Sequence, residues 1–275
     1  MPQQARDERA SPFIKWVGGK RGLLEQIRPH LPATYGRLFE PFVGGGALFF
    51  DQQPKRATLS DNNARLIATY RGLRDATDEV VWRLQGYRYD RDEYHAIRAQ
   101  TIDGAPDAAV AAWFIYLNKT GFNGLYRVNS KNRFNVPFGS YTNPNICDEP
   151  RLRACAAALQ QTNLVLGDFE EVSRKARKGD LVYFDPPYVP VSATSFTSYT
   201  AGGFDSEQQV RLRNVARHLA SRGVHVVLSN SSARAVIELY QDDFDILELR
   251  ARRSINAKAD GRQAVVEFLM KSRTF

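Results

Sequence analysis

Short apolar runs, several of which end at Gly or Asp, constrain the fold of this 275-residue chain more than any other feature. The early part of the chain has two such runs, Leu38 to Val43 and Ala57 to Ser60. The late part has five, at residues 164–166, 181–184, 224–229, 244–249 and 264–270. Amphipathic helical patterns lie among the late runs, notably at residues 206–221 and 233–240. Strands that alternate with helices predict an α/β fold with a mostly parallel sheet.

The last two predicted strands differ from the others in how they are joined. A polar loop from Arg250 to Gln263 connects them, with no helical pattern between. Parallel neighbours need a long crossover, whereas antiparallel neighbours do not. We therefore expect an antiparallel hairpin at one edge of the sheet.

The middle of the chain, residues 63–150, lacks the strand rhythm. Its pattern predicts helices at residues 64–74, 78–86, 90–101 and 108–119, followed by a polar, aromatic region at 120–144. A connection of that length is usually functional or disordered, and its aromatic residues argue against disorder. We interpret residues 63–150 as an inserted helical domain with a binding loop. Residues 1–10 form a tail, and residues 11–62 plus 151–275 form the α/β domain.

Composition excludes several classes of protein. A hydrophobic content of 43% is typical of a globular chain, and no apolar run approaches the roughly 20 residues of a membrane span. The polar first ten residues lack the apolar stretch of a secretory signal, which favours the cytoplasm. The net charge of +8 favours a polyanionic partner. Action as a monomer, without an obligate protein partner, is the simplest expectation.

Metal and disulfide chemistry have little support in the sequence. The two cysteines, Cys147 and Cys155, are expected to be small buried or half-buried apolar residues. The histidines are scattered without ligands at metal-binding spacing, so we predict no metal site; they are His30, His95, His218 and His225.

A glycine-rich segment, Glu40-Pro41-Phe42-Val43-Gly44-Gly45-Gly46-Ala47, follows the first predicted strand. Glycines allow the backbone to turn tightly and to approach a ligand. Asp61 ends the next strand, where a carboxylate commonly accepts hydrogen bonds from a ribose. The segment has neither a following Gly-Lys-Ser/Thr nor the spacing Gly-x-Gly-x-x-Gly. This combination favours a ligand that contains adenosine, and a purely structural turn is the alternative.

The tetrad Asp185-Pro186-Pro187-Tyr188 directly follows the apolar run 181–184. Prolines end a strand, here at the carboxyl edge of the sheet where α/β proteins bind ligands. The Asp185 carboxylate and the Pro186 carbonyl suit the two hydrogens of an exocyclic amine that is to be methylated, and Tyr188 suits stacking on the base. A duplex hides such an amine, so the base must be extruded. A plain proline turn is the alternative.

A third segment, Phe13-Ile14-Lys15-Trp16-Val17-Gly18-Gly19-Lys20, lies near the start of the chain. One interpretation is a buried tryptophan beside a turn with solvated lysines. The functional interpretation places Trp16 and Lys20 at the amino-acid end of a cofactor.

The order of these segments resembles the D12 class (α-group) of N6-adenine DNA methyltransferases, in particular the Dam-type enzymes. The resemblance runs from Phe13 to about Leu269 and includes further runs at residues 116–118, 123–127, 134–139, 191–194, 228–230 and 252–255. It implies a Rossmann-like, S-adenosylmethionine-dependent methyltransferase sheet with an inserted helical DNA-recognition domain. It also implies methylation of adenine N6 in double-stranded DNA by base flipping and direct displacement, at GATC or a closely related site. The expected location is the cytoplasm of a bacterial cell, or of the host cell for a phage-encoded enzyme.

The resemblance further implies roles for individual residues. The tetrad Asp185, Pro186, Pro187 and Tyr188 corresponds to the catalytic motif. S-adenosyl-L-methionine is expected to contact Trp16, Lys20, Phe42, Gly44, Gly46, Asp61, Asp168, Phe169 and Asp185. DNA is expected to contact Lys15, Phe122, Asn123, Leu125, Arg127, Asn135, Pro137, Tyr141 and Ser192. Phe122 stands where Dam-type sequences have tyrosine, so the hydroxyl of that tyrosine is missing here. The Arg250–Arg253 run is a candidate for DNA phosphates, with a solvated loop as the alternative.

Two other functions remain open at this point. Methylation of cytosine N4 or of an RNA base uses a similar tetrad, although a tetrad that begins with serine would favour cytosine. A DNA-binding or modification-sensing protein without activity would require a damaged tetrad or cofactor loop, and both are intact here.

Overall fold

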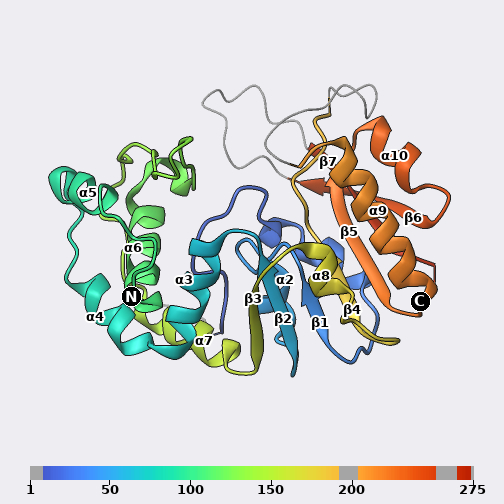
Figure 1. Cartoon of the computed structure of the whole chain (residues 1–275), viewed down its shortest axis with the longest axis horizontal. Helices are drawn as coiled ribbons and strands as arrows, with labels where there is room; N and C mark the ends of the chain where they lie inside the picture. Colours follow the sequence, from blue (N-terminus) through green and yellow to red (C-terminus); the bar gives the residue numbers. More distant parts are fainter. Residues whose placement is uncertain (1–8, 192–203, 252–264, 274–275) are drawn as a thin grey trace, which may run out of the picture. The chain divides into compact units, whose positions relative to one another are not determined.

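The structure is a computed structural model that describes residues 9–191, 204–251 and 265–273 (Figure 1). The chain divides into two compact units. The first comprises Met1–Gly19, Gly44–Gln53 and Asn63–Leu166, and the second comprises Lys20–Val43, Pro54–Asn62 and Gly167–Phe275. The inserted domain at residues 63–150 stays a prediction.

The second unit is built on a mixed sheet. Its strands are β1 (Leu38–Glu40), β2 (Ala57–Asp61), β4 (Leu181–Phe184), β5 (His225–Ser231), β6 (Phe244–Ala251) and β7 (Val265–Ser272). Within this unit the order is β2-β1-β4-β5-β7-β6. The first four strands in this order pair in parallel, and β7 pairs antiparallel with both β5 and β6. The predicted α/β class and the antiparallel hairpin at the sheet edge are both confirmed.

Helices accompany this sheet. The second unit contains η1 (Lys20–Gly22), α1 (Leu24–Ile27), η2 (Arg28–His30), α8 (Phe169–Ser173), α9 (Ser206–Ser221) and α10 (Arg234–Tyr240). The helix α9 has the predicted bounds, and the Asp205 side chain caps it by accepting a hydrogen bond from the Gln208 amide at 3.0 Å. Figure 1 shows α9 running beside β5, against which it packs.

The first unit is mainly helical. It contains α2 (Ala47–Gln52), α3 (Ala64–Asp75), α4 (Thr77–Gln85), α5 (Arg91–Arg98), α6 (Asp107–Thr120), η3 (Phe122–Gly124), α7 (Glu149–Leu159) and β3 (Thr162–Leu166). Most side chains of α6 are buried, and α3 packs closely on it. The approach needs Gly72, because a Cβ atom there would lie 2.2 Å from the Asp107 carbonyl oxygen.

Several predicted bounds were wrong. The first strand ends at Glu40, not at Val43, because Pro41 has no N–H to donate to the sheet, although the Val43 amide still donates to the Ser60 carbonyl at 2.9 Å. The helix predicted at 90–101 ends at Arg98. The sequence reasoning also missed α2 and α7.

Asp180 joins the beginnings of β1 and β4. Its buried carboxylate accepts hydrogen bonds from the Arg37 amide at 3.0 Å and the Arg177 amide at 2.8 Å. The Arg37 guanidinium also donates to it at 2.7 Å. Because Arg37 directly precedes β1 and Asp180 directly precedes β4, these bonds fix the register of the two central strands.

We expect Asp180→Ala to lower the free energy of unfolding by about 2–4 kcal/mol, because two backbone N–H groups and a guanidinium lose their acceptor. Urea unfolding followed by circular dichroism measures the change. Asp75→Ala is the control: Asp75 pairs with its neighbour Arg74 at an exposed position, so its loss should cost less than about 1 kcal/mol. Equal losses in the two variants would contradict the role of Asp180.

Candidate functional site

The carboxyl ends of three parallel strands bring several predicted residues to one edge of the sheet. The register aligns Leu38 of β1 with Ala57 of β2 and with Leu181 of β4. The predicted residues lie at the carboxyl ends of these strands. Asp61 is the last residue of β2, Phe42 follows β1, and the tetrad follows β4. The Asp61 carbonyl accepts a hydrogen bond from Gly167, which directly precedes the predicted residue Asp168. In α/β proteins this edge is where ligands bind.

Asp185 forms an ion pair with Lys20. The Lys20 Nζ atom lies 2.9 Å from Asp185 Oδ1, and the side chains are 3% and 20% exposed respectively. A buried ammonium needs a partner of opposite charge, and Asp185 supplies it. The structure thus brings together two residues that the sequence reasoning singled out in separate motifs.

Tyr188 and Glu267 complete this group. The Tyr188 hydroxyl donates to Glu267 Oε2 at 2.8 Å, and Lys20 Nζ lies 4.6 Å from the centroid of the Tyr188 ring. Glu267 Oε2 is also 3.8 Å from Lys20 Nζ. The sequence reasoning missed Glu267, because in the sequence it is one charged residue within an apolar strand.

The surroundings of Asp185 shift its ionisation. Burial raises the pKa of the Asp185 carboxyl above its usual value, while the ammonium of Lys20 opposes that rise. The negative charge of Glu267 adds to the rise in the pKa of Asp185. Two carboxylates therefore share one lysine, and the balance among the three groups sets the charge of Asp185.

Two buried amides hold the backbone of the tetrad. The Pro187 carbonyl accepts from Gln209 Nε2 at 2.9 Å, and the Val189 amide donates to Asn230 Oδ1 at 3.1 Å. Asn230 Nδ2 donates in turn to Gln209 Oε1 at 3.2 Å. Asn230 lies in the 228–230 run noted in the sequence, whereas no motif indicated Gln209. Prolines donate no backbone hydrogen bonds, so these amides take over the positioning of the segment.

An aromatic cluster lies at the same edge. The half-buried Phe42 stacks on the buried Phe169, with ring centroids 5.4 Å apart and planes at 27°. Phe184 and Phe204 meet the edge of Phe42 at 6.4 and 5.5 Å. The two predicted residues Phe42 and Phe169 are thus in contact, within a cluster of phenylalanine rings.

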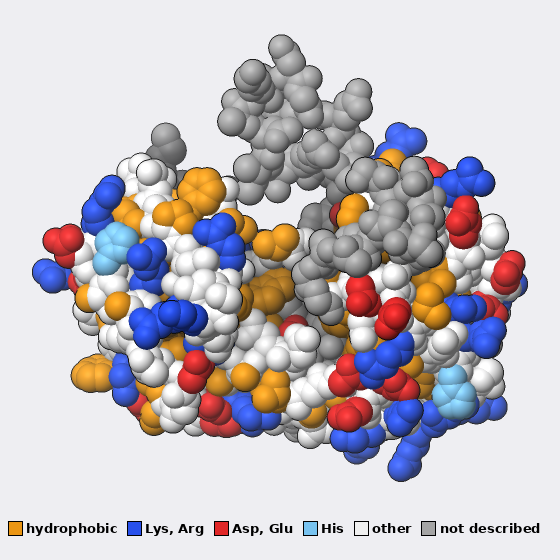
Figure 2. Space-filling model, turned by 45° about the horizontal axis from the view of Figure 1, so that its top comes forward, with side chains coloured by type: hydrophobic (Ala, Val, Ile, Leu, Met, Phe, Trp, Pro, Cys, Tyr) orange, Lys and Arg blue, Asp and Glu red, His pale blue; other side chains and the backbone are white. Residues whose placement is uncertain are grey.

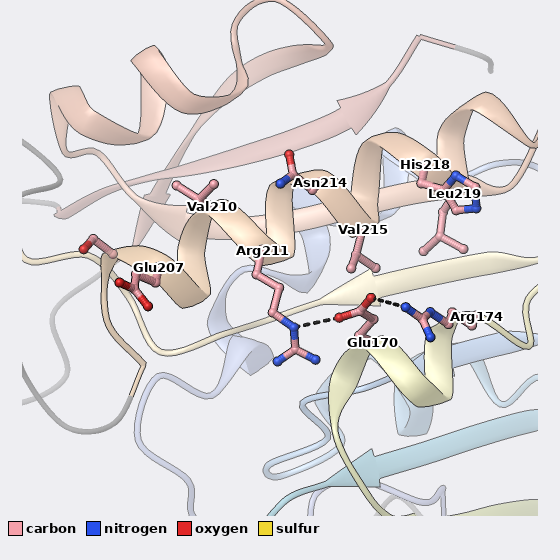
Figure 3. Close-up of a pocket in the computed structure, with 10 residues that line it drawn as sticks. Glu170, Arg174, Glu207, Val210, Arg211, Asn214, Val215, His218 and Leu219 are labelled. Atoms are coloured by element: carbon pink, nitrogen blue, oxygen red, sulfur yellow. Dashed lines mark hydrogen bonds and ion pairs between the residues drawn. The ribbon is translucent and has the colours of Figure 1, made fainter.

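Arg211 ties α9 to the start of α8. Its guanidinium pairs with Asp168 and Glu170, and it lies 4.6 Å from the Phe169 ring centroid. These hydrogen bonds to Arg211 lower the pKa of Glu170. Figure 3 shows Arg211 and Arg174 approaching Glu170 beside a groove of about 780 Å³ between the two helices. Apart from Glu170 and Arg211, which neighbour Asp168, the groove borders none of the groups described above.

In the first unit, Trp16 lies in a stack of aromatic rings. Its ring is 6.3 Å from Phe114 and 6.0 Å from Tyr126, with interplanar angles of 18° and 22°. Gly44, with φ of +47°, packs against it, and a Cβ atom there would lie 2.5 Å from Trp16 Cδ1. The Gly44 carbonyl accepts from the buried Tyr70 hydroxyl at 3.0 Å. The predicted glycine turn is therefore built around Trp16.

A buried asparagine anchors the Lys15 backbone. The Asn118 side chain accepts from the Lys15 amide at 2.8 Å and donates to the carbonyls of Lys15 and Gly124 at 2.9 and 2.7 Å. The exposed Lys15 ammonium lies 4.8 Å from the centroid of the Tyr141 ring. Lys15, Tyr141 and the segment at Gly124, which are far apart in the sequence, thus meet in one place.

The region predicted as a binding loop has a defined backbone that two isolated β-bridges hold in place. The bridges Gly121↔Phe138 and Val128↔Phe134 close it, and Phe122 donates to the Pro137 carbonyl at 2.9 Å. Arg127 Nε donates to Asn135 Oδ1 at 2.8 Å. The remaining predicted residues lie at its surface: Phe122 is 49% exposed, Asn123, Arg127 and Pro137 are exposed, and Leu125 is half-buried. Ser192 and Arg252–Arg253 lie outside the described residues.

The surface chemistry suits a polyanion that carries bases. Figure 2 shows Lys and Arg side chains beside exposed hydrophobic ones on the face drawn there.

Within the described ranges, no cluster of three His, Cys, Asp or Glu side chains is arranged to hold a metal ion. Likewise, none of the helices in the described part is long and apolar enough to cross a membrane. Both cysteines are free thiols, Cys155 buried and Cys147 half-buried, as predicted.

Comparison with known proteins identifies the family. The family model of the D12 class N6 adenine-specific DNA methyltransferases matches residues 16–255. The chain belongs to this family. It is 44% identical to the type II methyltransferase M1.LlaDCHI of Lactococcus lactis subsp. cremoris, over 94% of each chain. It is 37% identical to the type II methyltransferase M.MjaIII of Methanocaldococcus jannaschii, over 92% of this chain and 95% of that one.

A third relative carries the name that the sequence suggested. The chain is 35% identical to the DNA adenine methylase of Escherichia coli K12, over 94% of this chain and 93% of that one. The resemblance to the D12 class is therefore confirmed over nearly the whole sequence. This D12-class chain is a member of a family of adenine-specific DNA methyltransferases with an α/β fold.

We expect Lys20→Met to move the acid limb of the pH–activity profile to higher pH. On acidification Asp185 becomes protonated, and so loses its charge, at a pH that is set by its pKa. Burial raises that pKa and the Lys20 ammonium lowers it, so removal of Lys20 should raise it further. The profile of kcat/KM for DNA, measured at saturating cofactor, reports this pKa in the enzyme–cofactor complex before DNA binds. Lys175→Met, at an exposed position, is the control. An acid limb that stays in place or moves down would contradict the ion pair.

Proposed function

We propose that the chain is a site-specific DNA-methyltransferase (adenine-specific) that transfers a methyl group from S-adenosyl-L-methionine to adenine N6 in double-stranded DNA. One observation carries the proposal: Lys20 holds the Asp185 carboxylate at the carboxyl end of the sheet, directly before two prolines and Tyr188. This arrangement presents a carboxylate, a proline carbonyl and an aromatic ring within four consecutive residues of the chain. Those are the groups that methylation of a planar amine requires.

Conjugation with the ring holds the lone pair of an adenine amine in the ring plane. The Asp185 carboxylate and the Pro186 carbonyl accept its two hydrogens and favour a more tetrahedral nitrogen. S-adenosylmethionine, when bound, supplies a methyl group on a positively charged sulfur. Direct displacement would form the nitrogen–methyl bond as the methyl–sulfur bond breaks, with S-adenosylhomocysteine leaving and the amine losing one proton, and Asp185 would act as the acceptor that orients the amine. Positioning and fixed charges supply most of the acceleration.

The target base has to leave the duplex for this chemistry. Adenine N6 takes part in base pairing, so the residues that follow β4 reach it only if the base is flipped out. Tyr188 offers a ring face for stacking beside Asp185. The exposed Phe122, which lacks the hydroxyl of the Dam-type tyrosine, offers an apolar wedge for the duplex.

The chemistry of the candidate side chains fits S-adenosylmethionine. The faces of Phe42 and Phe169 suit an adenine ring beside Asp168, and the Asp61 carboxylate at the end of β2 suits the hydroxyls of a ribose. Lys20 suits a carboxylate. We also assign Trp16, Gly44, Gly46 and Asp185 to the cofactor.

The loop region of the first unit is proposed to recognise DNA, as part of a recognition domain at residues 63–150. Arg127, oriented by Asn135, suits the O6 and N7 atoms of a guanine, and Leu125 or Pro137 suits a thymine methyl. We assign the remaining contacts to Lys15, Phe122, Asn123, Tyr141 and Ser192. The proposed site is GATC or a closely related sequence. We propose action as a monomer in the bacterial cytoplasm, for a chromosomal or a phage-encoded enzyme alike.

Asp185→Ala is expected to reduce methyl transfer by at least about 100-fold, because the amine loses an oriented acceptor. Transfer of tritium from labelled S-adenosylmethionine to DNA measures the rate, and circular dichroism checks that the fold is kept. The exposed Asp245→Ala variant should keep full activity. Retained turnover in Asp185→Ala would contradict the assigned role.

Sequencing of DNA from an expressing host is expected to find N6-methyladenine at GATC. Arg127→Ala should cost about 1–3 kcal/mol of discrimination at one guanine position, because a bidentate contact to that base is lost. The control is Arg133→Ala, in the same loop, which should at most weaken binding to all DNA sequences equally. Modification spread over adenines without a shared motif would contradict site-specific recognition.

A further inference from the structure

Glu267 lies on β7, opposite Ser231 of β5 and Leu249 of β6. Its side chain is 18% exposed, so most of its charge is withdrawn from water. A carboxylate in that position needs partners, and two of them are Tyr188, at 2.8 Å, and Lys20, at 3.8 Å. We propose that Glu267 is a positioning residue for methyl transfer, which fixes the Tyr188 ring and shares the Lys20 ammonium with Asp185. This inference rests on the proposed function.

The hydrogen bond to Glu267 orients Tyr188. A tyrosine side chain has two rotatable bonds, so a fixed hydroxyl leaves the ring little freedom. Lys20, 4.6 Å from the ring centroid, also restrains it. Stacking on a flipped base requires such a defined ring plane, because a small misplacement of the base moves its amine away from Asp185.

The shared lysine couples Glu267 to Asp185. The charged and titratable groups around Asp185 are Lys20 from η1, Glu267 from β7, the neighbouring Tyr188, and Tyr183 from β4, with Glu40 of β1 facing Tyr183. Of the two charged groups beside Asp185, Lys20 lowers the pKa of that carboxyl and Glu267 raises it. Removing the charge of Glu267 should therefore lower the pKa of Asp185, whereas removing the charge of Lys20 should raise it.

Two substitutions in the full-length chain separate the two roles. Glu267→Gln keeps an acceptor for Tyr188 and removes the charge, whereas Glu267→Ala removes both. We expect Glu267→Gln to move the acid limb of the kcat/KM profile to lower pH, opposite to Lys20→Met. We expect the kcat of Glu267→Ala to lie roughly tenfold below that of Glu267→Gln, through loss of ring positioning. Tyr188→Phe should lower the kcat of the unaltered chain by a similar factor. The double variant Tyr188→Phe/Glu267→Ala should then lose little beyond Glu267→Ala, since both changes remove the same hydrogen bond.

Glu248→Gln is the matched control, because Glu248 is an exposed glutamate on the adjacent strand β6. It should leave both the profile and kcat unchanged. A second readout uses DNA with 2-aminopurine at the target adenine: Glu267→Ala and Tyr188→Phe should change its emission on binding to the same extent. Thermal unfolding checks that each variant folds.

The outcomes distinguish the inference from the proposed function. If the unaltered chain methylates adenine but Glu267→Gln leaves the acid limb in place and Glu267→Ala matches Glu248→Gln, the role of Glu267 is overturned. A uniform loss at all pH values in both Glu267 variants, with additive double variants, would also overturn it, since that is what a purely structural residue gives. If the unaltered chain methylates no DNA, it is the proposed function that fails.

Discussion

The ion pair between Lys20 and Asp185 is the interaction on which the candidate site depends. An ammonium that is 3% exposed is costly to bury, and Asp185, 2.9 Å away, and Glu267, 3.8 Å away, offset that cost. Such a group tolerates little displacement. A shift of any one of the three groups changes the balance of charge among them, so the positions of β4, β7 and the segment at Lys20 are mutually constrained. Burial raises the pKa of Asp185 at this place, and the same pairing opposes that rise.

Parallel strands explain why these groups meet at all. The register of β1, β2 and β4 brings their carboxyl ends to one edge, and the antiparallel β7, paired to β5, brings Glu267 to the same group. A residue at the end of a strand is placed by the whole ladder behind it. Gln209 and Asn230 then hold the proline backbone, which donates no hydrogen bonds of its own, so rigidity extends past the sheet into the tetrad.

Much of this arrangement could be predicted from the sequence, and the exceptions have physical reasons. Periodicity predicted α9 and β4 to the residue, because Asp205 caps the start of α9 and Asp180 and Asp185 bound the apolar run of β4. It could not predict the shorter β1, where Pro41 ends the ladder despite an apolar continuation. The motifs gave Lys20 and Asp185 separately, but their ion pair is a product of topology. Glu267 and Gln209 act through partners distant in the sequence, which no local pattern records.

The loop region shows how a segment without regular structure can have a defined backbone. Its two bridges and the Asn118 side chain consume backbone groups that would otherwise be left to water, and they fix the chain at Gly121, Gly124 and Val128. Gly124, with φ of +64°, allows the Lys15 side chain to pass where a Cβ atom would lie 2.5 Å away. Fixing the backbone in this way reduces the conformational entropy that binding has to remove. The side chains at the surface, Arg127 and Phe122 among them, then need to adjust only their own rotamers, so the proposed discrimination between bases would rest on geometry set before DNA arrives.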